Sequence, residues 1–446
     1  MTERERIVLR CFREQRDFVE TRVKNGIELY RKGWRRIRVV DAEGKPVRQA
    51  QIEARQISQH FKFGANLFML DEMESDEKNQ RYRDVFPQLF NLATLPFYWI
   101  DLEPEEGKTR YDKNSPRIYR RPAIDLCMEY CEQNRIEPKL HCLNYWHPQW
   151  LAGLPTSVVK KKMLKRFREI SERYADRIPM IEVTNETLRE GHEIRFYEED
   201  DYIDWSFHQA ERFFPTNELI INEGYAQWNA EAAYTNRNPY FMQVQRLLRD
   251  HVPVKGLGMQ FHSFDTLERE ASDMYVGRTG RYNPQFLCAV LDQLGRLGLP
   301  MQITEMTIPA YRDTPADEEV QAEILRNVYS LFFAQKEMEA IIYWNLPDGY
   351  AAFAPQGDMT KGENSYRGGL LRFDLTEKPA FKMLRQLIRH DWMTPTTTLT
   401  TDDDGFVTLR GFHGEYQLTI HQGEKCMQRE VNLLPGYDMT ALNLQL

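Results

Sequence analysis

The sequence lacks the features that mark membrane proteins, cysteine-based metal sites and nucleotide-binding loops. It has no run of about 18 apolar residues, so no segment is expected to span a membrane. The N-terminus, MTERERIVLR, has no apolar leader, which predicts a cytoplasmic protein if this start is native and a secreted protein if a signal peptide was removed. The six cysteines are scattered without a C-x-x-C pair, which fits a reducing compartment. Neither GxxxxGK[ST] nor GxSxG occurs.

An excess of basic charge is also missing. Lys and Arg number 59 against 67 Asp and Glu, so the formal net charge is −8. This mild acidity argues against nucleic acid or an anionic membrane as the partner, and it suits a neutral ligand such as a sugar. Aromatic residues make up 12% of the chain. Their rings can pack on the C–H faces of sugars, although most of them are expected in the core.

The central part of the chain, residues 61–394, alternates short apolar runs with helical segments. Eight such runs are candidates for strands: 61–66, 89–95, 138–146, 179–186, 218–225, 254–262, 299–306 and 340–346. Alternating strands and helices predict a parallel sheet, and eight such units predict a closed (β/α)₈ barrel, an α/β fold.

The two ends of the chain have a different character. Residues 1–60 are expected to form an amphipathic helix (1–33) and a β-hairpin that turns at 41–44. Residues 395–446 begin with a linker (395–400), followed by three alternating strands. Each end is too small to bury a core alone, so we expect the two to pair into one small accessory β-sandwich. Two unrelated flaps are the alternative.

Polar or aromatic residues follow nearly every predicted strand of the central part. In a barrel the carboxyl ends of all strands converge on one mouth, where active sites lie. The sequence therefore predicts that polar and aromatic side chains able to bind a ligand or catalyse a reaction meet at this mouth. They are Asn66, Asn144, Trp146, Asn185, Glu186, Asn222, Glu223, Gln260, His262, Glu305 and Trp344.

Two carboxyls stand out among these strand ends. Glu186 follows the fourth predicted strand and Glu305 the seventh, so they can meet across the mouth. Glycoside hydrolysis needs two carboxyls that flank the scissile bond. A glutamate at a strand end can instead cap a helix or pair with an arginine, and that reading stays open for each of them. Residues expected to bind the sugar or orient the nucleophile are Asn185, His141, Gln260, His262 and Trp344.

Histidines near carboxylates raise the alternative of a metal centre. The spacing of His141, His147 and His262 matches no standard zinc pattern, so we expect no metal and no cofactor.

Nine short motifs occur in chain order: FKFGAN, EPEEGKTRYD, HCLNYWHPQW, VTNE, INEGY, GMQFH, ITEM, YWNLPD and EKPAF. Together they resemble glycoside hydrolase family 10, the retaining family best known for endo-β-1,4-xylanases, over roughly residues 61–390. The resemblance implies double displacement without a metal, with Glu305 as nucleophile and Glu186 as acid/base. It implies carboxyls about 5–5.5 Å apart. It also implies a plant-type β-linked oligo- or polysaccharide as substrate.

The sequence departs from this family at the sugar-binding strand end. The family has an ENxxKW-like segment here, and the positions of its Glu, Asn and Lys are occupied by Thr94, Leu95 and Tyr98, with Trp99 next. We therefore expect an aromatic surface of Tyr98 and Trp99 to contact the sugar instead. His141 also lies five residues before Trp146 instead of four, so Asn144 is an alternative for its role. Lost polar contacts predict an altered sugar preference. The other hypotheses are a carbohydrate-binding barrel without catalysis and a metal-dependent barrel hydrolase.

Overall fold

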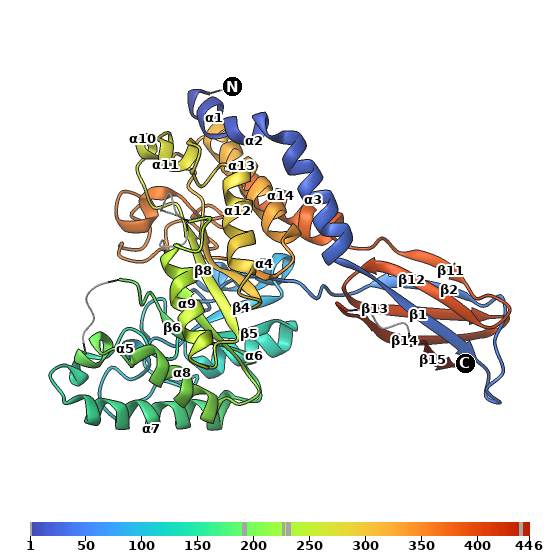
Figure 1. Cartoon of the computed structure of the whole chain (residues 1–446), viewed down its shortest axis with the longest axis horizontal. Helices are drawn as coiled ribbons and strands as arrows, with labels where there is room; N and C mark the ends of the chain where they lie inside the picture. Colours follow the sequence, from blue (N-terminus) through green and yellow to red (C-terminus); the bar gives the residue numbers. More distant parts are fainter. Residues whose placement is uncertain (1, 190–193, 225–227, 229–232, 437–439) are drawn as a thin grey trace.

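A computed structural model describes residues 2–189, 194–224, 228, 233–436 and 440–446 of the chain. It contains a closed barrel of eight parallel strands and, to one side of it, two further sheets built from the chain ends (Figure 1). No helix within these residues is long and apolar enough to cross a membrane.

All eight predicted barrel strands are confirmed, and pairing of the last with the first closes the barrel. Tyr225, at the end of one predicted run, lies outside the described residues. Buried strands read as nearly continuous apolar runs because both faces are covered. The strands are β3 (Lys62–Asn66), β4 (Leu92–Pro96), β5 (Glu137–His141), β6 (Met180–Asn185), β7 (Glu218–Glu223), β8 (Gly256–His262), β9 (Met301–Thr307) and β10 (Met338–Tyr343).

Helices pack around this barrel, and several begin at a side-chain cap followed by proline. Asn238, Asn283 and Thr314 each accept a backbone N–H of the first turn and precede a proline with a preset φ. The larger helices are α4 (Asp76–Leu89), α6 (Ile124–Asn134), α7 (Thr156–Tyr174), α8 (Tyr202–Phe213), α9 (Pro239–Arg249), α12 (Pro284–Gly295), α13 (Pro315–Ala334) and α14 (Pro379–Gln386). Shorter ones lie in the connections: α5 (Trp99–Leu102), η1 (Gln149–Leu151), η2 (Arg195–Glu198), α10 (Leu267–Glu270), α11 (Asp273–Val276), η3 (Gly362–Tyr366) and η4 (Leu387–Asp391).

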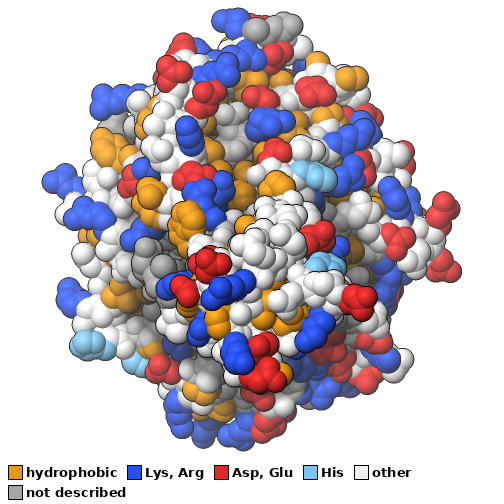
Figure 2. All heavy atoms as spheres, turned by 90° about the vertical axis from the view of Figure 1, so that its right-hand side faces the viewer, with side chains coloured by type: hydrophobic (Ala, Val, Ile, Leu, Met, Phe, Trp, Pro, Cys, Tyr) orange, Lys and Arg blue, Asp and Glu red, His pale blue; other side chains and the backbone are white. Residues whose placement is uncertain are grey.

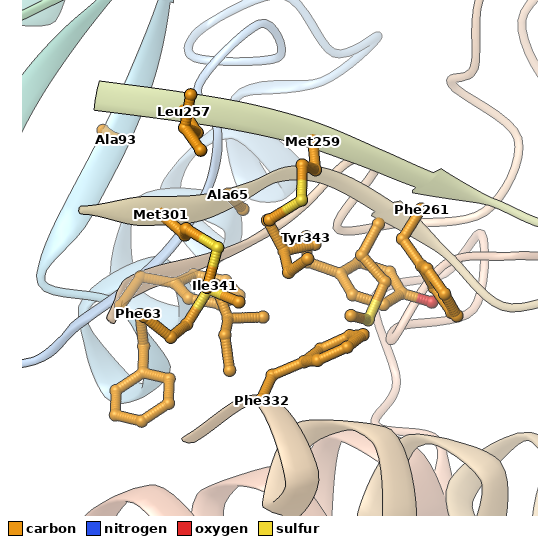
Figure 3. Packing of buried hydrophobic residues seen from close by; sticks show 14 of the residues in the cluster. Phe63, Ala65, Ala93, Leu257, Met259, Phe261, Met301, Phe332, Ile341 and Tyr343 are labelled. Atoms are coloured by element: carbon orange, nitrogen blue, oxygen red, sulfur yellow. The ribbon is translucent and has the colours of Figure 1, made fainter. Parts of the chain in front are cut away.

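The main core lies between the barrel strands and these helices. Figure 3 shows Ile341 and Tyr343 of β10 beside Met301 of β9, with Phe332 of α13 facing them. These side chains are fully buried. Such packing holds the strand ends in fixed positions, which a catalytic site requires.

The N-terminal helices belong to the barrel and not to the accessory module, contrary to the prediction. They are α1 (Glu3–Val8), α2 (Arg10–Glu14) and α3 (Arg16–Tyr30). α3 runs so close to α13 that a Cβ on Gly26 would lie 2.2 Å from the carbonyl oxygen of Ala334. Arg4 forms buried ion pairs with Glu270 and Asp317. The apolar face of this segment is therefore buried on barrel helices.

The accessory module consists of two sheets contributed by both chain ends, as predicted. One sheet has the order β12-β1-β15 and the other β11-β2-β13-β14. Acidic and basic side chains are interspersed on the end of the molecule that carries it (Figure 2). The strands are β1 (Lys32–Val40), β2 (Gln51–Gln56), β11 (Thr397–Thr400), β12 (Phe406–Phe412), β13 (Gly414–Gln422), β14 (Lys425–Leu433) and β15 (Leu442–Gln445).

Two details of this module differ from the prediction. β1 and β2 do not form a hairpin, because they lie in different sheets and only Val40 and Pro46 bridge across the turn. β1 and β2 each bury one face against the opposite sheet. β1 forms its hydrogen bonds with β12, and β2 with β13, both from the C-terminal part of the chain. The predicted linker also contains strand β11, which pairs with β2.

Candidate active site

A cavity of about 760 Å³ opens at the carboxyl ends of the barrel strands. This size is typical of a small-ligand site. Most of the residues that the sequence indicates line it: Tyr98, His141, Trp146, Asn185, Glu186, Gln260, His262, Glu305 and Trp344. The mouth therefore brings together side chains from six strands or the loops directly after them.

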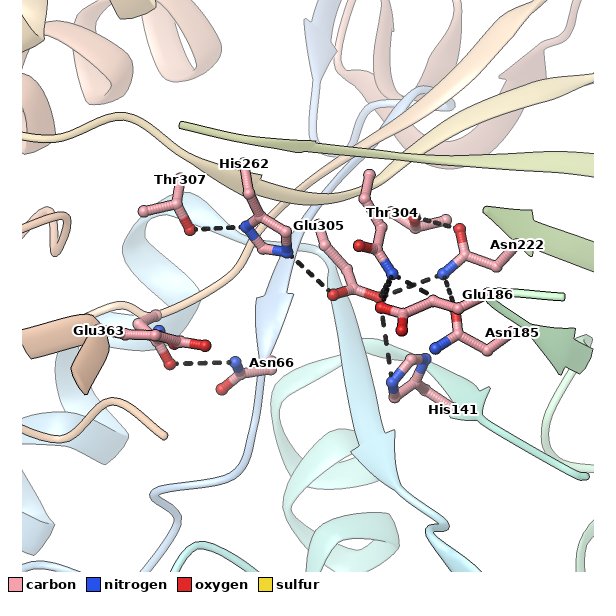
Figure 4. A network of polar contacts seen from close by, with 12 residues as sticks. Asn66, His141, Asn185, Glu186, Asn222, His262, Thr304, Glu305, Thr307 and Glu363 are labelled. Atoms are coloured by element: carbon pink, nitrogen blue, oxygen red, sulfur yellow. Dashed lines mark hydrogen bonds and ion pairs between the residues drawn. The ribbon is translucent and has the colours of Figure 1, made fainter. Parts of the chain in front are cut away.

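Glu186 and Glu305 lie close together at the floor of this cavity. The amide nitrogen of Gln260 donates to Glu186 Oε1 at 3.0 Å and to Glu305 Oε1 at 3.2 Å. The two acceptor oxygens therefore cannot be further apart than the sum of these two hydrogen bonds. Figure 4 shows both carboxyls between His141 on one strand and Asn222 on another.

Glu305 is almost completely buried and accepts several hydrogen bonds. Asn222 Nδ2 lies 3.1 Å from its Oε1, and His262 Nε2 lies 3.1 Å from its Oε2. The Thr304 hydroxyl donates to Asn222 Oδ1 and so turns the amide nitrogen toward Glu305. Burial raises the pKa of Glu305 to about 8, with the charges of Glu182 and Glu186 adding to the rise and that of His141 opposing it.

The pKa values of the two histidines next to Glu305 shift in opposite directions. Burial lowers the pKa of His262 to about 4, so this ring is neutral. The Thr307 hydroxyl lies 3.0 Å from His262 Nδ1, and His262 Nε2 lies 3.1 Å from Glu305 Oε2, so both ring nitrogens have a polar partner. Burial also lowers the pKa of His141, but the charge of Glu182 outweighs it and raises the pKa overall.

A buried charge cluster inside the barrel holds His141. Glu182 contacts His141 Nδ1 through one oxygen and Lys139 Nζ through the other, the latter at 2.5 Å. Burial raises the pKa of Glu182, but these two cations lower it to about 2. His141 Nε2 lies 2.9 Å from the Tyr98 hydroxyl and 4.0 Å from Glu305 Oε1. Glu182 thus favours the protonated form of His141 beside Glu305.

Glu186 sits one residue beyond β6 and has a positive φ of 54°. The Tyr145 hydroxyl donates to its Oε2 at 2.8 Å, and Arg189 Nη1 donates to the same oxygen at 2.6 Å. Burial raises the pKa of Glu186, but the hydrogen bonds from Gln260 and Tyr145 and the charge of Arg189 lower it overall. The opposite pKa shifts of the two carboxyls favour the proton of this pair on Glu305 in the ligand-free protein.

Glu223 secures the backbone that follows Glu186. Its Oε1 accepts the backbone N–H and the hydroxyl of Thr187, and its Oε2 accepts the backbone N–H of Leu188. Burial raises the pKa of Glu223 to about 7 despite these donors. This carboxyl contributes to the site by fixing the position of Glu186.

Three residues expected to bind sugar do not line the cavity. Asn222 lies beneath it and contacts Glu305 and Asn185. Asn144 is buried and bonds to Ser206 and His147, so His141 and not Asn144 occupies the position beside Glu305. Trp99 turns away from the cavity, because its indole N–H donates to Glu103 at 2.8 Å and its ring packs on Trp150.

The sequence interpretation missed several residues that line the cavity. Tyr145 is adjacent to Trp146 in the motif HCLNYWHPQW, so its position signalled a role. The others lie on long connections without a recognisable pattern: Phe68, Arg120, Arg121, Arg189, Phe264, Phe353, Glu363 and Tyr366.

Comparisons with known proteins concern the barrel as a whole. The sequence model of glycosyl hydrolase family 10 matches residues 57–386. The chain is 23% identical to the anti-sigma-I factor RsgI6 of Acetivibrio thermocellus, over 86% of this chain and 44% of that protein. It is also 23% identical to endo-1,4-beta-xylanase 1 of Arabidopsis thaliana, over 83% of this chain and 34% of that protein. The chain thus spans less than half of the length of these relatives.

Solved structures of similar fold include two xylanases. Xylanase 10B from Thermotoga petrophila RKU-1 in complex with xylobiose is 18% identical, with a TM-score of 0.59 over 74% of this chain and 95% of that one. Native xylanase 10B from Thermotoga maritima is 19% identical, with a TM-score of 0.58 over 74% of this chain and 96% of that one. At this identity the likeness demonstrates the barrel fold.

Proposed function

This chain belongs to glycosyl hydrolase family 10, and on that premise we propose that it is a retaining β-glycoside hydrolase with Glu305 as nucleophile and Glu186 as acid/base. The observation that carries the proposal is the single amide nitrogen of Gln260, which donates to both carboxyls. It supports a separation below the roughly 6.5–9.5 Å that inverting enzymes need to admit a water molecule.

The reaction would proceed in two displacements. Glu305 attacks the anomeric carbon while Glu186 gives its proton to the departing oxygen, which leaves a glycosyl ester on Glu305. Glu186 then takes a proton from water, whose oxygen attacks the anomeric carbon and releases Glu305. Two inversions retain the configuration of the sugar.

The first step needs the proton on Glu186 and the charge on Glu305, which is the reverse of what the pKa shifts of the two carboxyls favour in the ligand-free protein. Sugar hydroxyls that donate to Glu305 favour its ionised form. An aglycone that displaces Arg189 from Glu186 removes the charge that keeps this carboxyl ionised. Substrate binding would therefore place the proton where the chemistry needs it.

The substrate we propose is a plant-type β-linked oligo- or polysaccharide, with a sugar preference altered from that of xylanases. Relatives named endo-1,4-beta-xylanase support the linkage class. In the segment where the sequence departs from the family pattern, Thr94 and Leu95 are buried in β4. The Tyr98 hydroxyl lies 2.9 Å from His141 Nε2. These three residues leave few polar groups for a neutral xylose unit, which supports a different sugar.

A carbohydrate-binding barrel without turnover is the second candidate. The ion pair between Arg189 and Glu186 favours it, because this pair stabilises the ionised form of the proposed acid.

Hydrolysis of a panel of aryl β-glycosides by the wild type and Glu305→Ala tests the proposal. The panel contains the xyloside, glucoside, galactoside, arabinoside, glucuronide, xylobioside and cellobioside. We expect turnover of at least one substrate by the wild type and none by Glu305→Ala, with circular dichroism confirming that the variant folds. Binding of an oligosaccharide without turnover of any substrate would favour the second candidate, and inhibition by a chelator would indicate a metal-dependent hydrolase.

A further inference from the structure

We propose that Arg120 binds a carboxylate on the sugar that occupies the glycone end of the cavity, so that the substrate carries a uronic acid there. This inference rests on the proposed glycosidase function and specifies its substrate class.

Arg120 is a buried cation that faces the cavity with most of its donors unused. The residue is only 5% exposed and lines the same cavity as Glu186 and Glu305. Its Nη2 donates to Asn345 Oδ1 at 3.2 Å, whereas its Nε and Nη1 are buried without a hydrogen-bond partner among the residues that the structure describes. Buried polar atoms are nearly always paired, so these two nitrogens indicate a missing acceptor.

Neighbouring carboxylates do not supply that acceptor. Glu363 is separated from Arg120 by the amide of Asn345, whose nitrogen donates to Glu363 Oε2 at 3.1 Å. Asp101 is engaged by Arg121 at 2.5 Å. Burial and the adjacent Arg121 charge both lower the pKa of Arg120. The charge of Glu363 opposes this only in part. A buried cation without a directly paired carboxylate is costly, and a carboxylate entering the cavity would offset that cost.

The loop around Arg120 is held in place before any ligand binds. Arg120 has a positive φ of 64°, which directs its side chain away from the course of the loop. Arg110 is buried and donates to the carbonyl oxygens of Pro116, Asp101 and Arg121. Arg121 also donates to the carbonyl oxygen of Arg120 at 2.9 Å. A site prepared in this way loses little entropy on binding.

The position of Arg120 assigns it to the glycone. The Phe68 ring lies 5.9 Å from the Arg120 guanidinium and 5.4 Å from the Trp344 ring. Trp344 in turn packs on His141, beside Glu305. Figure 4 shows Glu363 and Asn66 on one side of Glu305, and Glu186 and Asn185 on the other. Because the acid lies on the side of the leaving group, the Arg120 end receives the sugar that stays on Glu305.

A carboxylate fits this site better than a hydroxyl does. Arginine pairs with carboxylates through charge-assisted hydrogen bonds, which are about twice as strong as neutral ones. Glucuronides and glucosides differ only at C6, where one carries a carboxylate and the other a hydroxymethyl group. The pair therefore isolates the contribution of Arg120.

The test compares aryl β-glucuronide with aryl β-glucoside in the wild type, Arg120→Lys, Arg120→Met and Arg117→Gln. Arg117 lies on the same loop but pairs with Glu72 and does not line the cavity, so it is the matched control. We expect kcat/KM for the glucuronide to exceed that for the glucoside by at least about tenfold. The ratio should fall to about one in Arg120→Met and stay unchanged in Arg117→Gln. The inference is overturned if kcat/KM of the wild type for the glucoside equals or exceeds that for the glucuronide, or if the ratio is preserved in Arg120→Met.

Calorimetry with D-glucuronate, D-glucose and glucose 6-sulfate separates this inference from the proposed function. If no glycoside is hydrolysed in a Glu305-dependent way, the proposed function fails, but glucuronate binding that exceeds glucose binding and is lost in Arg120→Met still supports the anion site. Equal binding of glucuronate and glucose overturns it. Tighter binding of the sulfate overturns the assignment to a carboxylate. If Arg120→Met does not fold, the inference is judged from the wild-type preference for the glucuronide over the glucoside and from the same ratio in Arg120→Lys.

Discussion

The two carboxyls at the barrel mouth stand in contrasting surroundings. Glu305 lies within strand β9, is 5% exposed, accepts hydrogen bonds from Asn222 and Gln260 and contacts His262 Nε2. Glu186 lies just beyond β6, and one of its partners, Arg189, has a side chain that is 67% exposed. The barrel core therefore fixes the environment of Glu305, whereas the pKa of Glu186 depends on hydrogen bonds from Gln260 and Tyr145 and on the charge of the exposed Arg189.

Replacing Glu305 should have the largest effect. Glu305→Ala removes the proposed nucleophile, and we expect kcat to fall by roughly 10⁴-fold or more. Azide should restore turnover of an activated aryl glycoside and give a glycosyl azide of inverted configuration. Failure of azide to rescue a folded variant would contradict the assignment of Glu305.

Replacing Glu186 should produce a loss that depends on the leaving group. General acid catalysis contributes about 10²–10⁴-fold. In Glu186→Ala we therefore expect a loss of this size on a disaccharide and a much smaller one on a dinitrophenyl glycoside, which needs no proton to depart. Steady-state kinetics on both substrates measures the difference, and equal losses would rule out the acid role.

The buried cluster beneath Glu305 should respond mainly in stability. Glu182→Gln leaves Lys139 and His141 buried without their counter-charge, which should lower the free energy of unfolding by about 3–5 kcal/mol. Denaturant unfolding measures this change. Glu132→Gln, which removes the exposed partner of Arg177, is the control and should change stability by less than about 1 kcal/mol. Similar values for the two variants would contradict the importance of the buried cluster.

Changing the loop partner of Glu186 should have the smallest effect. The charge of Arg189 lowers the pKa of Glu186, so Arg189→Gln raises it. In the free enzyme Glu186 is the carboxyl of lower pKa and Glu305 the one of higher pKa, so Glu186 governs the acidic limb of kcat/KM, and this limb should move to higher pH by up to about one unit. A shift to lower pH, or none, would show that Arg189 does not control the acid.

Much of the fold could be predicted from the sequence because apolar runs and strand ends carry a local signal. The eight strands and the polar residues after them follow directly from this pattern. The pairing of β1 and β2 with C-terminal strands could not be predicted, since a turn between two alternating segments is compatible with either a hairpin or a crossing between sheets. The docking of α3 on α13 depends on a close approach at Gly26 that no local pattern reveals.

The candidate site was predictable to a similar extent. Glu186, Gln260 and Glu305 end strands, so the barrel brings them together. Trp99 was misplaced because, although it directly follows Tyr98, the start of the short helix α5 turns the two side chains in different directions. Arg120 was missed because its position depends on the hydrogen bonds of Arg110 and on a positive φ within a long loop.

The central claim is that this barrel hydrolyses a β-glycoside with retention through Glu305. Proton NMR of the first product formed from an aryl β-glycoside tests it most directly, since mutarotation is slower than turnover at high enzyme concentration. The account predicts that the β-anomer appears first and then equilibrates. Initial appearance of the α-anomer would show inversion and contradict the assignment of Glu305 as the nucleophile.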